Sequence, residues 1–131
     1  MPISKKAIIT KIHLIISVIV VVSAAIVYGF DLGAFLDIDL NTIDEQNFSK
    51  AIMGLYFGFS ILWILGILRS EYLKPALISN TVFMLALAVG RLLSIIMDGL
   101  PSEAYLFGTF GELVLGCYGL WVLNSKYLKK S

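Results

Sequence analysis

The chain has 131 residues, of which 59% are hydrophobic and 15% charged, and its formal net charge is +1. A soluble domain of this length cannot bury so much apolar surface, because small domains have a high surface-to-volume ratio. The composition excludes an ordinary soluble enzyme, a disordered chain and a nucleic-acid binder, and it indicates a small polytopic membrane protein. A single cysteine and a single histidine exclude a disulfide framework and a multi-cysteine metal site.

Apolar stretches of membrane-spanning length recur along the chain. A transmembrane helix needs about 20 mostly apolar residues, and four stretches meet this requirement: 12–30, 51–68, 75–97 and 104–125. The third is interrupted only by Arg91 and the fourth only by Glu112. The segment 31–50 between the first two stretches is longer than the other links and acidic, which predicts a loop outside the membrane.

Short links join the second stretch to the third and the third to the fourth. Short links make neighbouring helices antiparallel partners. The sequence therefore predicts an all-α fold of one domain, an antiparallel bundle of four transmembrane helices that spans the whole chain 1–131.

The basic residues predict the orientation of the bundle. Eight of the ten lie on one side of the predicted membrane: Lys5, Lys6, Lys11, Arg69, Lys74, Lys126, Lys129 and Lys130. Seven of the nine acids lie on the other side: Asp31, Asp37, Asp39, Asp44, Glu45, Asp98 and Glu103. The positive-inside rule then places both termini in the cytoplasm, and the expected location is the bacterial cytoplasmic (inner) membrane.

The N-terminal stretch has a second interpretation. Lysines followed by an apolar run and Val22-Ser23-Ala24 resemble a signal peptide with its cleavage site. The apolar run continues to Phe30, which is long for a signal peptide and favours a retained helix. Cleavage would leave three spans and an external N-terminus.

Arg91 and Glu112 are the two charges inside predicted spans. A charge at membrane depth is costly unless it is paired or hydrated, so each marks a candidate functional site. At about 1.5 Å per residue, they lie roughly 9 Å and 12 Å from the outer end of their spans. Similar depth on adjacent helices predicts an Arg91–Glu112 pair in the outer half of the bundle, facing inward.

Other polar side chains fall near this pair by helical phase. Asp98 shares the Arg91 face of the third span and Ser94 lies beside it, while Tyr105 lies in line with Glu112. The predicted ligand-binding set is Arg91, Glu112, Asp98, Ser94, Tyr56 and Tyr105. His13 is expected as a hydrated histidine at the membrane interface. No motif indicates catalytic residues, a cofactor or a metal.

The sequence also resembles a known family. The resemblance covers roughly residues 12–123 and rests on AIMGLYFG at 51–58, GRLLS at 90–94, DGLP at 98–101 and Glu112-Leu113. This is similar to the small four-helix bacterial membrane proteins catalogued as domain of unknown function 4345. The resemblance implies the four-helix architecture and a polar core of Arg91, Asp98 and Glu112, but no activity.

Three interpretations of the Arg91–Glu112 pair remain open from the sequence: an ion pair that locks two helices, a site for a ligand, lipid headgroup or ion, and an acid/base role. The leading hypothesis is a non-enzymatic membrane protein that binds or moves a small polar or amphipathic ligand. The alternative is a structural or accessory subunit of a larger membrane complex. The expected partners are the lipid bilayer, a small ligand or lipid, and a second copy or a membrane complex, without nucleic acid.

Overall fold

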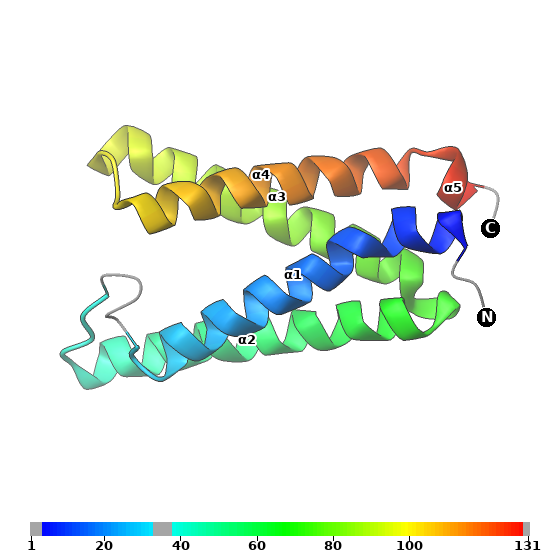
Figure 1. Cartoon of the computed structure of the whole chain (residues 1–131). Helices are drawn as coiled ribbons and strands as arrows, with labels where there is room; N and C mark the ends of the chain where they lie inside the picture. The colour runs from blue at the N-terminus through cyan, green and yellow to red at the C-terminus, as the bar shows by residue number, and fades with distance from the viewer. Residues whose placement is uncertain (1–3, 33–37, 130–131) are drawn as a thin grey trace.

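The computed structural model describes residues 4–32 and 38–129 and is helical almost throughout. The long helices are α1 (Lys5–Gly29), α2 (Ile43–Leu68), α3 (Leu73–Asp98) and α4 (Glu103–Leu123). A short 3-10 turn η2 (Ser70–Tyr72) joins α2 to α3, and a single helical turn α5 (Lys126–Lys129) follows α4 (Figure 1). The predicted all-α fold of four long helices packed antiparallel is confirmed.

The four long helices are long and apolar enough to cross a membrane. Large apolar side chains point outward along each of them, among them Ile19 on α1, Ile61 on α2, Val89 on α3 and Phe107 on α4, each at least 60% exposed. An outward apolar surface of this extent is stable against lipid rather than water. By helix length and composition, the chain is therefore a multi-pass membrane protein in contact with a bilayer.

Helix α2 begins well before the apolar stretch that starts at Ala51. Thr42 caps its first turn: the Thr42 hydroxyl accepts from the Glu45 amide, and the Glu45 carboxylate accepts from the Thr42 amide at 2.9 Å. This reciprocal pair satisfies amides that the first turn leaves without helical partners. The last part of the expected loop 31–50, residues 43–50, is therefore helix, while Asp37 lies outside the described residues.

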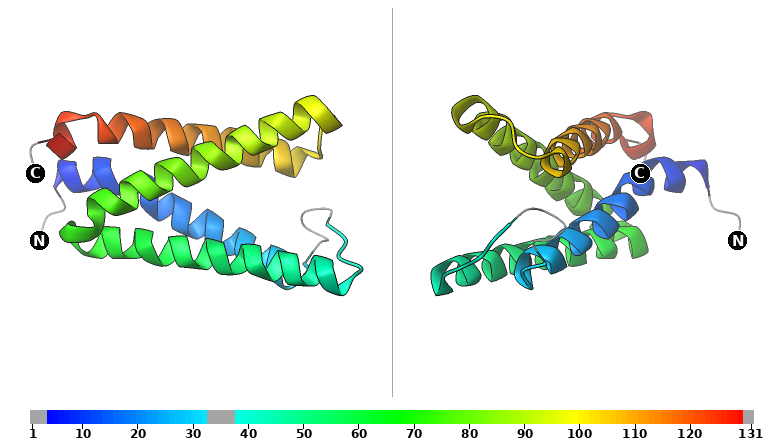
Figure 2. Two further views of the ribbon diagram at one scale, coloured as in Figure 1. Left: turned by 180° about the vertical axis from the view of Figure 1, so that it is seen from behind. Right: turned by 60° about the vertical axis from the view of Figure 1, so that its left-hand side comes forward.

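The helices form two hairpins. Helix α1 packs along α2 and α3 packs along α4. The two hairpins converge at the end of the bundle where α1 begins and α5 lies, and they diverge toward the opposite end (Figures 1 and 2). We call the converging end, which carries Lys5, Arg69, Lys74 and Lys126, the basic end, and the diverging end, which carries Asp31, Asp98 and Glu103, the acidic end.

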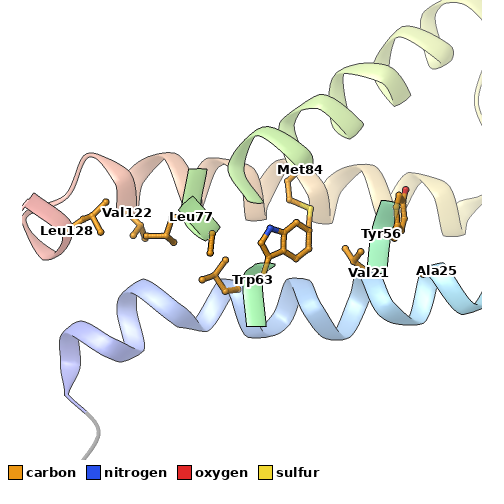
Figure 3. Packing of buried hydrophobic residues seen from close by; sticks show 10 residues of the cluster. Val21, Ala25, Tyr56, Trp63, Leu77, Met84, Val122 and Leu128 are labelled. Atoms are coloured by element: carbon orange, nitrogen blue, oxygen red, sulfur yellow. The ribbon is translucent and has the colours of Figure 1, made fainter. Parts of the chain in front are cut away.

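The buried core joins the two hairpins. Trp63 of α2 is completely buried and lies beside Met84 of α3, with Val21 of α1 nearby (Figure 3). The Phe83 ring contacts Trp63 at 5.1 Å between centroids and Tyr56 at 5.2 Å. These edge-to-face contacts continue the core from Trp63 toward Tyr56, where the hairpins begin to separate.

Candidate functional site

Arg91 of α3 and Glu112 of α4 form an ion pair, as the sequence predicts. The Arg91 Nε donates to both carboxylate oxygens of Glu112, at 3.0 Å and 2.8 Å. The side chains are 23% and 12% exposed, so the pair is largely removed from the surroundings. Because both groups are charged, these hydrogen bonds are charge-assisted, and they tie α3 to α4 at this level.

Tyrosines from three helices surround the guanidinium. Its carbon lies 5.7 Å from the ring centre of Tyr105 on α4, within the range of a cation–π contact. Tyr28 of α1 is close enough for its hydroxyl to interact with the guanidinium. The Tyr56 ring of α2 packs edge-on against Tyr28 at 5.8 Å. The guanidinium is thus lined by aromatic rings that carry hydroxyl groups.

Two cavities meet at this cluster. One, of about 580 Å³, extends between α1 and α4, and we call it the α1–α4 cavity. The other, of about 530 Å³, lies along Gly90 of α3, and we call it the Gly90 cavity. Five residues line both: Tyr28, Tyr56, Leu87, Arg91 and Tyr105. The charged pair therefore lies at a junction of two spaces of ligand-binding size.

The α1–α4 cavity is lined mostly by apolar side chains. Val21 and Met84 close its inner side and are buried, whereas Phe107 and Phe110 at its edge are 74% and 67% exposed. The same cavity therefore borders both the core of the bundle and the outward surface that faces lipid. Of the residues that the structure describes, only Arg91 and Glu112 are charged among those lining this cavity.

The other predicted site residues divide into two groups. Tyr56 and Tyr105 line both cavities, and Ser94 lines the Gly90 cavity. Asp98 does not line either cavity within the described part of the chain; it is exposed and accepts a hydrogen bond from the Ser94 hydroxyl at 2.9 Å. The structure therefore brings five of the six predicted residues to the cavities and places Asp98 at the acidic end.

The glycines of α4 serve two purposes along one face. A Cβ at Gly116 would lie 2.5 Å from the Leu85 side chain, and one at Gly119 would collide with the Thr81 hydroxyl. A Cβ at Gly108 would meet no described atom within 4 Å, and Gly108 lines the α1–α4 cavity. Toward the basic end the glycines let α3 approach, whereas toward the acidic end they leave open space.

Comparison with known proteins identifies the family. Residues 9–123 match the family described as Domain of unknown function (DUF4345). The chain belongs to this family. Searches of curated proteins and of solved structures give no significant match. The resemblance read from the sequence is confirmed, and the family description assigns no activity to this DUF4345 protein.

One candidate residue of the DUF4345 chain lies where the sequence did not predict it. Expected at the membrane interface, His13 is only 2% exposed and packs against Tyr118, with ring centres 5.0 Å apart. Neither imidazole nitrogen has a hydrogen-bond partner within the described part of the chain. His13 is buried because α1 crosses the bundle between α2 and α4 at this level, which hydropathy cannot reveal.

Tyr28 is a site residue that the sequence patterns do not predict. Its position near the end of a span is typical of an interfacial aromatic residue, yet in this DUF4345 protein it lines both cavities and lies beside Arg91. Helical phase within α3 and α4 could find Arg91 and Glu112, but the contribution of α1 depends on how the hairpins cross.

Among the described residues, no three His, Cys, Asp or Glu side chains come together as a candidate metal site.

Proposed function

We propose that this protein is a non-enzymatic multi-pass membrane protein that binds, or helps to move, a small amphipathic ligand. The head of the ligand would lie at Arg91 and Glu112, and its apolar part would occupy the α1–α4 cavity. The observation that carries the proposal is the junction of the two cavities at a partly buried ion pair, beside Tyr28, Tyr56 and Tyr105.

A purely structural pair explains this arrangement less well. Burying two charges for stability alone is usually unfavourable, since desolvation can exceed the Coulombic gain. A structural pair also needs no adjoining space, whereas Arg91 lines cavities of about 530 Å³ and 580 Å³. The structural or accessory role is the competing hypothesis, and it predicts that nothing binds at these cavities.

We also propose that the basic end faces the cytoplasm of a bacterial cell and the acidic end faces outward. The fold collects Lys5, Arg69, Lys74 and Lys126 at one end of the bundle (Figure 1). Lysine and arginine on short segments are retained on the cytoplasmic side. In this orientation the Arg91–Glu112 site lies in the outer half of the inner membrane, within reach of lipids of the outer leaflet.

Native mass spectrometry of gently extracted protein tests the proposed function. We expect a retained amphiphile on the wild-type protein and its loss from Gly108→Leu, because the new side chain would fill the α1–α4 cavity. Gly58→Leu on α2 is the matched control, since a Cβ there meets no described atom within 4 Å and Gly58 lines neither cavity. Equal retention by both variants, or an empty wild-type protein, would contradict the proposal.

A further inference from the structure

We propose that the ligand of the α1–α4 cavity is an uncharged amphiphile whose head accepts hydrogen bonds, such as the glycerol ester of a monoacylglycerol. This inference rests on the proposed function, because it names the ligand class of that same site. It follows from three observations: the charge balance of the lining, the hydrogen-bonding groups at the head position, and the shape of the apolar part.

The charge balance disfavours an anionic head. Among the described residues that line the α1–α4 cavity, only Arg91 and Glu112 are charged, and their charges cancel. Both hydrogen bonds run from the Arg91 Nε to the Glu112 carboxylate, so the carboxylate already neutralises the positive charge of the guanidinium. An added anion would leave one uncompensated negative charge in a poorly hydrated place, which is costly. An uncharged head adds no such charge.

The hydrogen-bonding groups favour an acceptor. A guanidinium can only donate, and it has five N–H groups. The Glu112 carboxylate accepts hydrogen bonds from the Nε–H group alone. Tyr28 and Tyr56 add phenol groups, which donate as well as accept. A head with carbonyl or hydroxyl oxygens matches this surplus of donors better than an ammonium head, which would bring only further donors.

The apolar part of the cavity favours an aliphatic chain delivered from the membrane. Phe107 and Phe110 border the cavity and are exposed on the outward face of α4, while Val21 and Met84 line its buried side. A chain can therefore pass from lipid between α1 and α4 without crossing a polar surface. The charged pair lines the same cavity, where it would bind the head group.

Monoolein and oleate form a matched pair of probes, because they share one acyl chain and differ in whether the head is charged. We expect native mass spectrometry titrations at pH 7.5 to show monoolein binding at least tenfold more tightly than oleate. The Glu112→Gln variant keeps the shape and removes the negative charge, so it should shift the preference toward oleate by at least tenfold. Glu103→Gln, which neutralises an exposed acid on the same helix, should leave the preference unchanged.

The outcomes separate the two proposals. Tighter binding of oleate by the wild-type protein would overturn the uncharged-head inference and leave the proposed function standing. Binding of neither probe, together with no retained amphiphile, would overturn both. The wild-type comparison needs no variant, so it decides the inference even if Glu112→Gln does not fold.

Discussion

The Arg91–Glu112 ion pair is a contact at which one substitution would leave a partly buried charge without its partner. Removing one partner of a buried pair strands the other charge, whereas removing both does not. The side chains are 23% and 12% exposed, so the loss from a single replacement should be at the low end of the range for buried pairs, about 3 kcal/mol. The free energy of unfolding should therefore fall measurably when either partner is replaced alone.

A double-mutant cycle tests this contact. Arg91→Ala and Glu112→Ala should each lower the free energy of unfolding in detergent, and the double variant should lose at least about 1 kcal/mol less than the sum of the two. Arg69→Ala with Glu71→Ala is the matched control, because that pair is 3.7 Å apart and about two-thirds exposed. Its coupling should be about 0.5 kcal/mol or less. Additive losses at Arg91 and Glu112 would show that the two side chains are not energetically paired.

His13 should tolerate an apolar replacement. Both of its ring nitrogens are buried without a protein partner among the described residues, and such atoms carry a desolvation penalty. His13→Leu should therefore leave the thermal unfolding midpoint unchanged or raise it. Tyr118→Phe is the contrast, since the Tyr118 hydroxyl donates to the Ile9 carbonyl at 2.7 Å and its loss should cost about 1 kcal/mol. A clear loss of stability in His13→Leu would mean that the imidazole has a partner.

At the scale of single helices, the glycines of α2 differ in what surrounds them. A Cβ at Gly66 would collide with the Ala76 Cβ and lie 3.1 Å from the Tyr72 carbonyl oxygen. Neither atom can move without the backbone. A Cβ at Gly58 would meet no described atom within 4 Å. The close approach of α2 to the start of α3 therefore depends on Gly66, whereas Gly58 has no such role within the chain.

Matched alanine substitutions on α2 test this difference. Gly66→Ala should destabilise the protein by about 1–3 kcal/mol, the usual cost of overpacking. Gly58→Ala should be neutral or stabilising by up to about 1 kcal/mol, because alanine favours the helix. Thermal unfolding in one detergent measures both. Equal effects would mean that α2 and α3 are further apart at their turn than the structure places them.

Sequence patterns predict the helices better than their boundaries. The apolar run identifies α2, but the start of this helix at Ile43 is set by the capping box of Thr42 and Glu45. That capping box is a short polar signal, and it lies in a stretch whose acidic residues alone predict a loop. The other helix ends lie close to charged or glycine residues, such as Gly99 with its φ of 102° after α3. Hydropathy therefore finds the spans, whereas the capping side chains of Ser4 and Thr42 mark where α1 and α2 begin.

At the scale of the molecule, the candidate site was predictable only within one hairpin. Arg91 and Glu112 meet because a short turn makes α3 and α4 neighbours and because the two residues lie at similar depth. Both facts can be inferred from the sequence alone. The places of Tyr28 and His13 depend on how the two hairpins cross, and no local pattern encodes that crossing. Asp98 shows the limit of helical phase, since a shared face does not bring a residue at the helix end to the same cavity.

The orientation of the whole bundle is a prediction that labelling can test. In a Cys117→Ser background, a cysteine at Asn41 near the acidic end should react with a membrane-impermeant maleimide on intact cells. A cysteine at Glu71 near the basic end should react only after lysis. The asymmetry of lysine and arginine predicts this result, and the opposite pattern would place the Arg91–Glu112 site in the inner half of the membrane.

The proposed function places an amphiphile in the α1–α4 cavity with its head at Arg91 and Glu112. Photocrosslinking in a bilayer tests this directly, using a monoacylglycerol that carries a diazirine either in the head or in the chain. The head probe should label peptides that contain Arg91 or Tyr105, and the chain probe should label α1 around Val20–Ala24 and α4 around Phe107–Val114. Labelling spread evenly over the lipid-facing residues of all four helices, and unchanged in Gly108→Leu, would contradict the claim.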